Sequence, residues 1–367
     1  MYINTGTKIK IGTRESALAV WQAKQVQDFF TLQGISSEIV FIKSEGDADL
    51  ITPLYAMGVQ GVFTKSLDAA LLNNKIDVAV HSFKDVPIQA ARGLQKAAVL
   101  ERHSPKDILV YKSSLDAGSW KLDIGQDFFP ANNVHRTKYT IATGSIRRAA
   151  QWKNRFPDHS IESLRGNVNT RLRKLDESNW NGAIFAAAGL ERLGIRPKNS
   201  IDLDWMLPAP AQGAVAVYCR EDDFSILDAC KIMNDKRTEI CTTAERDFLN
   251  ALAGGCAAPI SALAKIENGI ITLKGNILSP DGNLKIESEK FDIVKNAGTL
   301  GQCCADDVLR NGAESLIEKH ERYMASANNK VNHFCFSNFS PSKQVIHGVK
   351  LIFNAAFKKE KNLILHE

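Results

Sequence analysis

The stretch YTIATGSIRRAAQWKN, residues 139–154, decides the fold of this chain. It reads as a short apolar strand over 139–143, a Gly144-Ser145 turn and a helix from Ile146 to Asn154. The same alternation continues with a strand over 161–164, a helix over 168–177 and a buried strand over 182–188. Short apolar runs that alternate with helical patterns are typical of α/β layering.

The first hundred residues follow the same pattern. The predicted elements are strands over 8–12, 37–43 and 77–81 and helices over 16–31 and 64–73, the first helix turning Leu18, Trp21, Val26 and Phe29 to its apolar side. The segment 207–219 is expected to cross back to this first unit. Two α/β units joined by two crossings make a hinged pair with a ligand cleft, as in periplasmic binding proteins.

A third, smaller α+β unit is expected after residue 236. A helix over 242–252, alternating strands with a turn at Ser279-Pro280-Asp281-Gly282, and a helix over 300–318 make it up. The predicted domains are therefore domain 1 (residues 1–104 and 214–232), domain 2 (105–213) and domain 3 (236–320). To the tail, residues 321–367, the sequence assigns no role.

The charge of the chain is concentrated in two places. The formal net charge is +5, and the tail from Tyr323 carries six Lys against two acidic residues, so the body is near neutral. A general nucleic-acid binder is expected to carry its positive charge on the body. Within the body, the segment from Arg136 to Lys174 contains ten basic residues and only two acidic ones.

The cysteines and the apolar runs indicate a cytoplasmic protein. Seven cysteines (219, 230, 241, 256, 303, 304 and 335) show no zinc-like spacing, and the sequence gives no reason to expect a metal. The N-terminal residues contain no apolar signal segment, and no apolar run has membrane length. Reduced thiols in the cytoplasm are the expectation.

Several of the basic residues of 136–174 are arginines at or near strand-to-helix junctions. Arg147 and Arg148 follow Thr143-Gly144-Ser145, Arg165 precedes a predicted helix, and Arg171 lies within that helix. Guanidinium forks and helix N-terminal amides that converge suit a small ligand with several carboxylates or phosphates. On the pattern alone, a solvated basic face explains these residues equally well.

Four other positions are candidates, each with a plain alternative. Lys84-Asp85 ends a buried strand, where α/β folds place ligands, but such pairs are usually solvated surface. Cys256 follows two glycines, although lone cysteines are more often inert. His81 fits a core or hydrogen-bonded histidine. Ser16 is a good N-cap, and Arg14 beside it is either an anion contact or part of the cap.

Taken together, eight short motifs resemble those of the porphobilinogen deaminase family, and the resemblance covers about residues 7 to 320. In order they are TRES (13–16), HSFKDVP (81–87), TGSIRR (143–148), LRGNVNTR (164–171), AGLERLG (188–194), AQGA (211–214), TAER (243–246) and GGC (254–256). The family joins four porphobilinogen units head to tail, with loss of ammonia, to give hydroxymethylbilane. The resemblance therefore implies a transferase of tetrapyrrole synthesis.

The resemblance also implies a role for each candidate. Cys256 would carry a covalent dipyrromethane primer through a thioether, Asp85 would be the catalytic carboxylate, and Lys84 would hold a carboxylate of primer or substrate. Six arginines would bind the carboxylates of cofactor and substrate, and three residues with hydroxyl groups would add hydrogen bonds. These residues are Arg14, Arg147, Arg148, Arg165, Arg171 and Arg192, with Ser16, Thr143 and Ser145.

The sequence departs from the family at a few places. Glu45, Ala56 and Gln60 stand in the glycine-rich lid loop where basic residues are usual, and the stretch 118–138 is longer than the family's connection. These departures bear on efficiency more than on reaction class. The expected partner is porphobilinogen alone, with no nucleic acid and no membrane, and the expected state is a monomer.

Two other functions remain open from the residues alone. A ligand-binding module would share the hinged α/β pair, but it has no need of Cys256 or of Lys84-Asp85. A nucleic-acid binder would use the basic region 136–174 and would show steep salt dependence. The arginines of that region lie on separate junctions without an aromatic stacking platform, which disfavours this second alternative.

Overall fold

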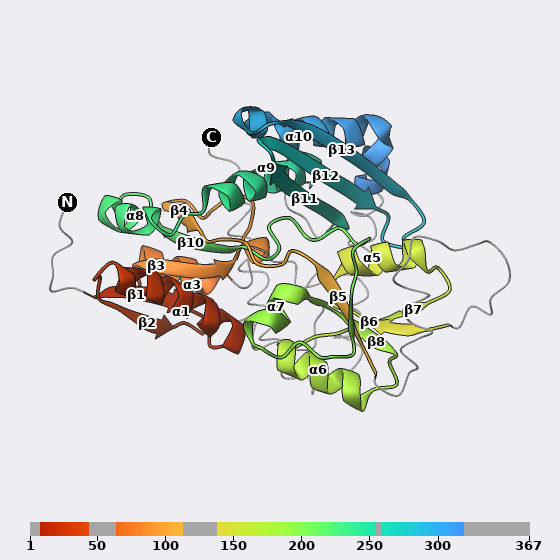
Figure 1. Cartoon of the computed structure of the whole chain (residues 1–367), viewed down its shortest axis with the longest axis horizontal. Helices are drawn as coiled ribbons and strands as arrows, with labels where there is room; N and C mark the ends of the chain where they lie inside the picture. Colours follow the sequence, from red (N-terminus) through yellow and green to blue (C-terminus); the bar gives the residue numbers. More distant parts are fainter. Residues whose placement is uncertain (1–7, 44–63, 113–137, 254–257, 319–367) are drawn as a thin grey trace, which may run out of the picture. The chain divides into compact units, whose positions relative to one another are not determined.

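The computed structural model describes residues 8–43, 64–112, 138–253 and 258–318 (Figure 1). Several sequence predictions lie outside the described residues. They concern Cys256 with its two glycines, the lid residues Glu45, Ala56 and Gln60, the long stretch 118–138 except its last residue, and the tail 321–367.

The first sheet has the strand order β2-β1-β3-β10-β4. Strands β1, β2 and β3 are parallel, whereas β10 runs antiparallel to both β3 and β4. The chain therefore does cross back to the first unit, as predicted. The strands are β1 (Ile9–Thr13), β2 (Ser37–Phe41), β3 (Val78–Ser82), β4 (Leu94–Val99) and β10 (Val215–Arg220), with helices α1 (Ala17–Leu32), α3 (Lys65–Leu72) and α8 (Phe224–Lys231).

The second sheet repeats this plan with the order β7-β6-β8-β5-β9. Strands β6, β7 and β8 are parallel, and β5 is antiparallel to β8 and β9. The stretch 139–154 forms β6 and α5, as predicted. The elements are β5 (Asp107–Tyr111), β6 (Thr140–Ala142), α5 (Ile146–Arg155), β7 (Ser160–Glu162), α6 (Val168–Glu177), β8 (Gly182–Ala186), α7 (Ala187–Arg192) and β9 (Ser200–Asp202).

The third sheet is an antiparallel meander of β11, β12 and β13, against which α9 and α10 pack (Figure 1). Gly282, at φ +79°, closes the predicted turn. The elements are α9 (Lys236–Ala253), β11 (Ile260–Glu267), β12 (Ile270–Leu278), β13 (Lys285–Ile293) and α10 (Ala297–Val308). The predicted fold class, two α/β units and a smaller α+β unit, is confirmed.

Two local predictions were wrong, whereas the apolar side of α1 is as predicted: Phe29 is half-buried and packs against the same core as the buried Phe30. Helix α9 begins at Lys236 rather than Thr242. The predicted last helix does not run unbroken to residue 318, because α10 passes into a π-helical turn, Leu309–Ala313, in which Gly312 has φ +97°. A glycine adopts that left-handed conformation without a side-chain clash.

Strand direction decides where the candidate residues lie. Because β1 and β3 are parallel, their carboxyl ends lie at one edge of the first sheet, and Arg14 and Lys84-Asp85 follow these ends. In the second sheet, Thr143 and Arg165 likewise follow β6 and β7, which run in parallel. Each sheet therefore presents its candidates at its carboxyl edge.

The close contact of α9 with α10 depends on a glycine. A Cβ at Gly301 would lie 2.5 Å from the carbonyl oxygen of Ala244 in α9, whereas a Cβ at Gly298 in the same helix would meet nothing within 4 Å. We expect Gly301→Ala to lower the free energy of unfolding by about 1–3 kcal/mol through overpacking. Gly298→Ala should leave it unchanged or raise it by up to about 1 kcal/mol. Thermal unfolding of both variants measures the difference, and equal midpoints would contradict this packing.

Candidate active site

Asp85 lies at the carboxyl edge of the first sheet, in a 3-10 turn formed by Phe83–Asp85 directly after β3. The turn is anchored by Phe83, which is only 2% exposed and whose amide donates to the carbonyl of Ala214 on the neighbouring crossing segment. Asp85 itself is exposed, and Lys84 is half-buried. The sequence thus buries the residue before the pair and leaves the carboxylate available to a ligand.

Asp107 is the buried anion of the site, and it was not among the predicted residues. Its carboxylate, fully buried, accepts hydrogen bonds from Arg147 (2.8 Å) and from Nε and Nη2 of Arg148 (3.0 and 2.8 Å). Burial alone would raise the pKa of Asp107, but the two guanidinium groups lower it to about 2. Asp107 therefore stays ionised at neutral pH and holds both arginines in place.

Arg147 and Arg148 also bind main-chain carbonyls. Arg147 donates to the carbonyl of Leu207 at 2.6 Å, and Arg148 donates to that of Ile184 at 3.1 Å. Each guanidinium carries five N–H donors in a rigid fork, so two of them present more donors than one carboxylate accepts. With two cations against one anion, this part of the site keeps a net positive charge.

Gln212 links these arginines to the Asp85 turn. Its amide nitrogen donates to Asp107 at 2.8 Å, and its amide oxygen accepts from the ammonium group of Lys84 at 3.3 Å. Burial lowers the pKa of Lys84 to about 8, an effect that the charge of Asp85 opposes and that of Arg148 reinforces. Lys84 is therefore charged at neutral pH and loses its charge as the pH rises through about 8.

Arg165 and Arg171 belong to the same cluster of charges. Burial, together with the nearby charges of Arg148 and Arg165, lowers the pKa of Arg171 to about 10, and the charge of Asp85 opposes this shift. Arg171 is fixed by a 2.7 Å hydrogen bond from its Nε to the carbonyl of Gly166, whose φ is +113°. The structure thus brings arginines beside the second sheet and Asp85, which follows a strand of the first sheet, into one electrostatic neighbourhood.

Ser145 and Ser16 act as helix caps in the structure. The hydroxyl oxygen of Ser145 accepts from the amide of Arg148, and that of Ser16 accepts from Ala19, both at 3.4 Å. The buried Thr143 accepts a hydrogen bond from the amide of Ser145 at 3.2 Å. Caps of this kind place the helix N-termini, with their amide groups, at the site.

Arg14 lies near His81, at the ends of the adjacent strands β1 and β3. His81 is buried, as predicted, and burial lowers its pKa to about 3, with a further contribution from Arg14. The imidazole is therefore neutral at physiological pH and adds no charge to the site.

Arg192 makes contacts different from those of the other arginines. Its Nη2 donates to the carbonyl of Gly213 at 2.7 Å, and its guanidinium carbon lies 5.2 Å from the centre of the Trp21 ring. Trp21 in turn meets His103 edge to face at 5.4 Å. Arg192 thus connects α7 with α1 and the crossing segment, and it contacts neither Asp107 nor Lys84.

Sequence reasoning missed the residues that join the domains. Arg102 pairs with Glu245, whose side chain is fully buried and also accepts from the amides of Ala211 (2.7 Å) and Ala264 (2.8 Å). Arg102 and Ala211 lie on the two crossing segments, and Glu245 lies in the third unit. The TAER motif contained this signal, since a charged pair inside an amphipathic helix often marks a contact.

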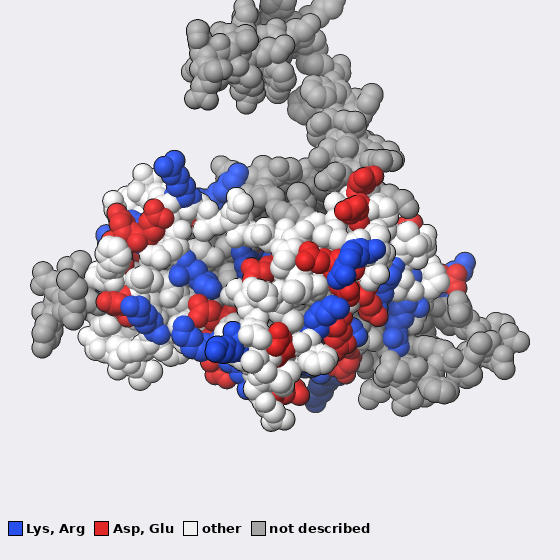
Figure 2. Space-filling model, turned by 90° about the horizontal axis from the view of Figure 1, so that it is seen from above, with Lys and Arg blue, Asp and Glu red and all other residues white. Residues whose placement is uncertain are grey.

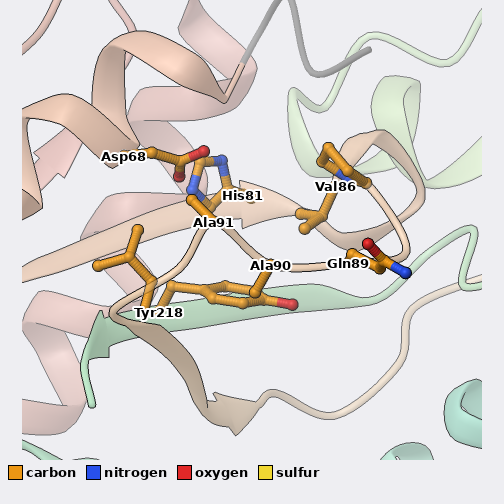
Figure 3. A pocket seen from close by; sticks show the side chains of 9 residues that line it. Asp68, His81, Val86, Gln89, Ala90, Ala91 and Tyr218 are labelled. Atoms are coloured by element: carbon orange, nitrogen blue, oxygen red, sulfur yellow. The ribbon is translucent and has the colours of Figure 1, made fainter. Parts of the chain in front are cut away.

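A small hollow lies behind the Asp85 turn, within the first unit (Figure 3). It is narrow and open in part to solvent. Its walls are Asp68, His81, Val86, Pro87, Gln89, Ala90, Ala91, Leu94 and Tyr218. Burial raises the pKa of both Asp68 and Tyr218. None of the clustered arginines lines this hollow, so it is separate from the cationic site.

The described residues suit a group that carries several carboxylates. Lys84 and the arginines supply donors, and α9 passes beside the Asp85 turn and ends at Ala253, three residues before Cys256.

No described helix is long and apolar enough to cross a membrane. The five described cysteines, Cys219, Cys230, Cys241, Cys303 and Cys304, are free thiols.

Comparison with known families gives two matches along the chain. Residues 9–228 match the model described as porphobilinogen deaminase, dipyromethane cofactor binding domain, and residues 239–310 match that of the porphobilinogen deaminase C-terminal domain. Together these matches span most of the chain.

Solved structures give looser similarities. The amino acid ABC transporter substrate-binding protein AbpA from Streptococcus pneumoniae is 15% identical, with 66% of this chain and 92% of that chain covered and a TM-score of 0.34. The periplasmic VFT2 domain of BvgS from Bordetella pertussis is 13% identical, with 60% and 84% covered and a TM-score of 0.35. Similarity this loose carries no argument about this chain.

The pairing of Asp107 with two arginines predicts a large effect of its removal. Asp107→Ala leaves two buried guanidinium groups without their counter-charge, and we expect a loss of about 3–5 kcal/mol in the free energy of unfolding. The matched control is Asp202→Ala, because Asp202 pairs with Lys106 and Arg196 at the surface, where such pairs contribute about 0–1 kcal/mol. Denaturant unfolding of both variants tests this expectation, and similar losses would contradict it.

Proposed function

The chain belongs to the porphobilinogen deaminase family, and we propose that Asp85 and the cations around it are where it carries out the family's reaction. The enzyme is a hydroxymethylbilane synthase, a transferase of tetrapyrrole biosynthesis. It polymerises porphobilinogen, with release of ammonia, using a dipyrromethane cofactor. The proposal assigns this activity to particular residues.

The observation that carries the proposal is an exposed carboxylate among buried cations. Asp85 is exposed, whereas Arg147, Arg148 and Arg165 are each less than 9% exposed. Porphobilinogen carries an acetate and a propionate, so a growing chain brings many carboxylates into one site. Clustered guanidinium groups match that charge, and an exposed acid beside them, in contrast to the buried Asp107, serves a different purpose.

We assign to Asp85 the stabilisation of positive charge on the substrate. When ammonia leaves, its nitrogen needs a proton and the pyrrole methylene becomes cationic. A carboxylate close to the pyrrole N–H stabilises this charge and can transfer the proton. Asp85 ends the 3-10 turn and is exposed, so a substrate can reach it.

We assign the binding of the cofactor and substrate carboxylates to the basic residues. Lys84, Arg14, Arg147 and Arg148, with the hydroxyls of Ser16, Thr143 and Ser145, are proposed for the cofactor. Arg14, Arg148, Arg165, Arg171 and Arg192 are proposed for the substrate. For Arg192, binding would compete with its present bond to Gly213. When bound, the dipyrromethane supplies the reactive pyrrole carbon, and Cys256 would hold it through a thioether.

The proposal also covers the domain boundaries, the oligomeric state and the cellular location of the protein. The three sheets fall within the ranges 1–104 with 214–232, 105–213 and 236–320, which supports these domain boundaries. We further propose a cytoplasmic monomer that binds neither nucleic acid nor membrane. On the face that Figure 2 shows, Lys and Arg side chains are interspersed with Asp and Glu, whereas a nucleic-acid binder is expected to cluster its basic residues on one face or in one stripe.

Replacement of Asp85 tests the catalytic assignment. Asp85→Asn keeps the size of the side chain and removes its charge, and we expect turnover to fall by at least about 100-fold. Because Asp85 is exposed, the midpoint of thermal unfolding should not change. Ammonia release and hydroxymethylbilane formation are the measurements, with Asp28→Asn, an exposed acid on α1, as control. Near-normal turnover in the Asp85 variant would rule out the assigned role.

A further inference from the structure

Arg246 is a buried arginine whose hydrogen bonds all go to the main chain around Asp85. It lies on α9 and is 9% exposed. Its Nη1 donates to the carbonyls of Val86 (3.0 Å) and Phe83 (3.4 Å), and its Nη2 donates to those of Pro87 (2.6 Å) and Ile88 (3.3 Å). One guanidinium group therefore binds four carbonyls of the segment 83–88.

The contact is reinforced through the ring of Phe83. The guanidinium carbon of Arg246 lies 4.5 Å from the ring centre, within the range of a cation–π interaction. Phe83 is the buried residue that anchors the 3-10 turn. The guanidinium group of Arg246 thus contacts both the Phe83 side chain and the main chain of the turn. Only the planar fork of arginine satisfies such an arrangement.

The opposite side of the segment packs in part against the first unit. Val86 is 8% exposed and belongs to the core cluster that contains Phe83 and Tyr218, whereas Pro87 is half-buried and Gln89 is exposed. Val86, Pro87 and Gln89 line the hollow that Figure 3 shows, together with His81 and Tyr218. The hydrogen bonds from α9 therefore add to this packing a set of fixed contacts with the main chain of residues 83–88.

We infer that Arg246 is a positioning residue of the reaction, which holds the backbone of residues 83–88 so that the Asp85 carboxylate stays in register with the cationic cluster. The inference rests on the proposed role of Asp85. Arg246 touches neither the reacting atoms nor Lys84. It acts through the turn that carries Asp85.

The placement of Arg246 on α9 gives this role a second consequence. Ala253, the end of the helix, lies seven positions further along the chain, which corresponds to about 10 Å along the axis. Cys256 follows three residues later in the sequence. One rigid helix therefore fixes the Asp85 turn and leads into the segment proposed to carry the cofactor. Glu245, the preceding residue, binds the crossing segments and strengthens this support.

The test is Arg246→Lys, with Arg246→Ala as a second variant. A lysine keeps the charge but cannot span four carbonyls. We expect kcat to fall by about 10–100-fold, with KM changed by less than about threefold, since misplacement of a catalytic group affects the chemical step. Amide hydrogen exchange of the peptide 82–92 should accelerate. Methylguanidinium, added to Arg246→Ala at a non-denaturing concentration, should restore part of kcat.

The matched control is Arg220→Lys. Arg220 also donates to carbonyls of the first unit, those of Leu71 (3.1 Å) and Ile76 (2.9 Å), but it lies at the end of β10 remote from the Asp85 turn. This control should lower thermal stability and leave kcat and exchange of 82–92 unchanged. Equal kinetic effects in the two lysine variants, or unaltered exchange of 82–92 in Arg246→Lys, would overturn the inference.

Failure of the inference is distinguishable from failure of the proposed function. If Asp85 has no catalytic role, Asp85→Asn turns over normally, and Arg246→Lys accelerates exchange without lowering kcat. If Asp85 is catalytic but Arg246 does not position it, Asp85→Asn is inactive and Arg246→Lys keeps its kcat. Loss of kcat in both variants, with faster exchange and methylguanidinium rescue only at Arg246, supports both.

Discussion

The site depends on the buried carboxylate of Asp107, which binds Arg147 and Arg148 together. Two guanidinium groups without a counter-charge would be too costly to bury, and two fully neutralised ones would not attract an anionic ligand. One carboxylate for two arginines meets both requirements, because it fixes the forks and leaves a net positive charge. Gln212 then extends the network to Lys84, so the cations of one sheet are tied to the Asp85 turn of the other.

The third unit supports both halves of this arrangement. Arg246 and Glu245 of α9 bind the Asp85 turn and the crossing segments. Elsewhere, Gln151 of α5 donates to Ser261 at 3.0 Å, and Asn154 donates to the carbonyl of Gly282 at 2.7 Å. The helix that presents Arg147 and Arg148 is thus held at its far end by the unit expected to carry the cofactor. The fold places Asp85 and the arginines proposed to bind carboxylates against one common support.

Periodicity and capping residues predicted most of the architecture, because these signals are local. Ser16 and Ser145 begin their helices as expected, and the crossing of 207–219 to the first sheet is confirmed. Arg148, Arg171, Lys84 and Asp85 were expected in one site, and their charges do influence one another. Asp107, Gln212 and Arg246 were not foreseen as parts of it, since their roles arise from contacts between residues 40 or more positions apart. The spacing of residues along the sequence does not predict such contacts.

The cationic site is proposed to bind a pyrrole oligomer that is covalently attached to Cys256. Detection of a pyrrole adduct on Cys256 is the direct test of this attachment. The measurement is the intact mass of the protein after incubation with porphobilinogen, followed by peptide mapping. The account predicts two linked pyrrole units on the peptide that contains Cys256, no modification of the other six cysteines, and no adduct in Cys256→Ser. An unmodified Cys256 after incubation, or an adduct on another residue, would contradict it.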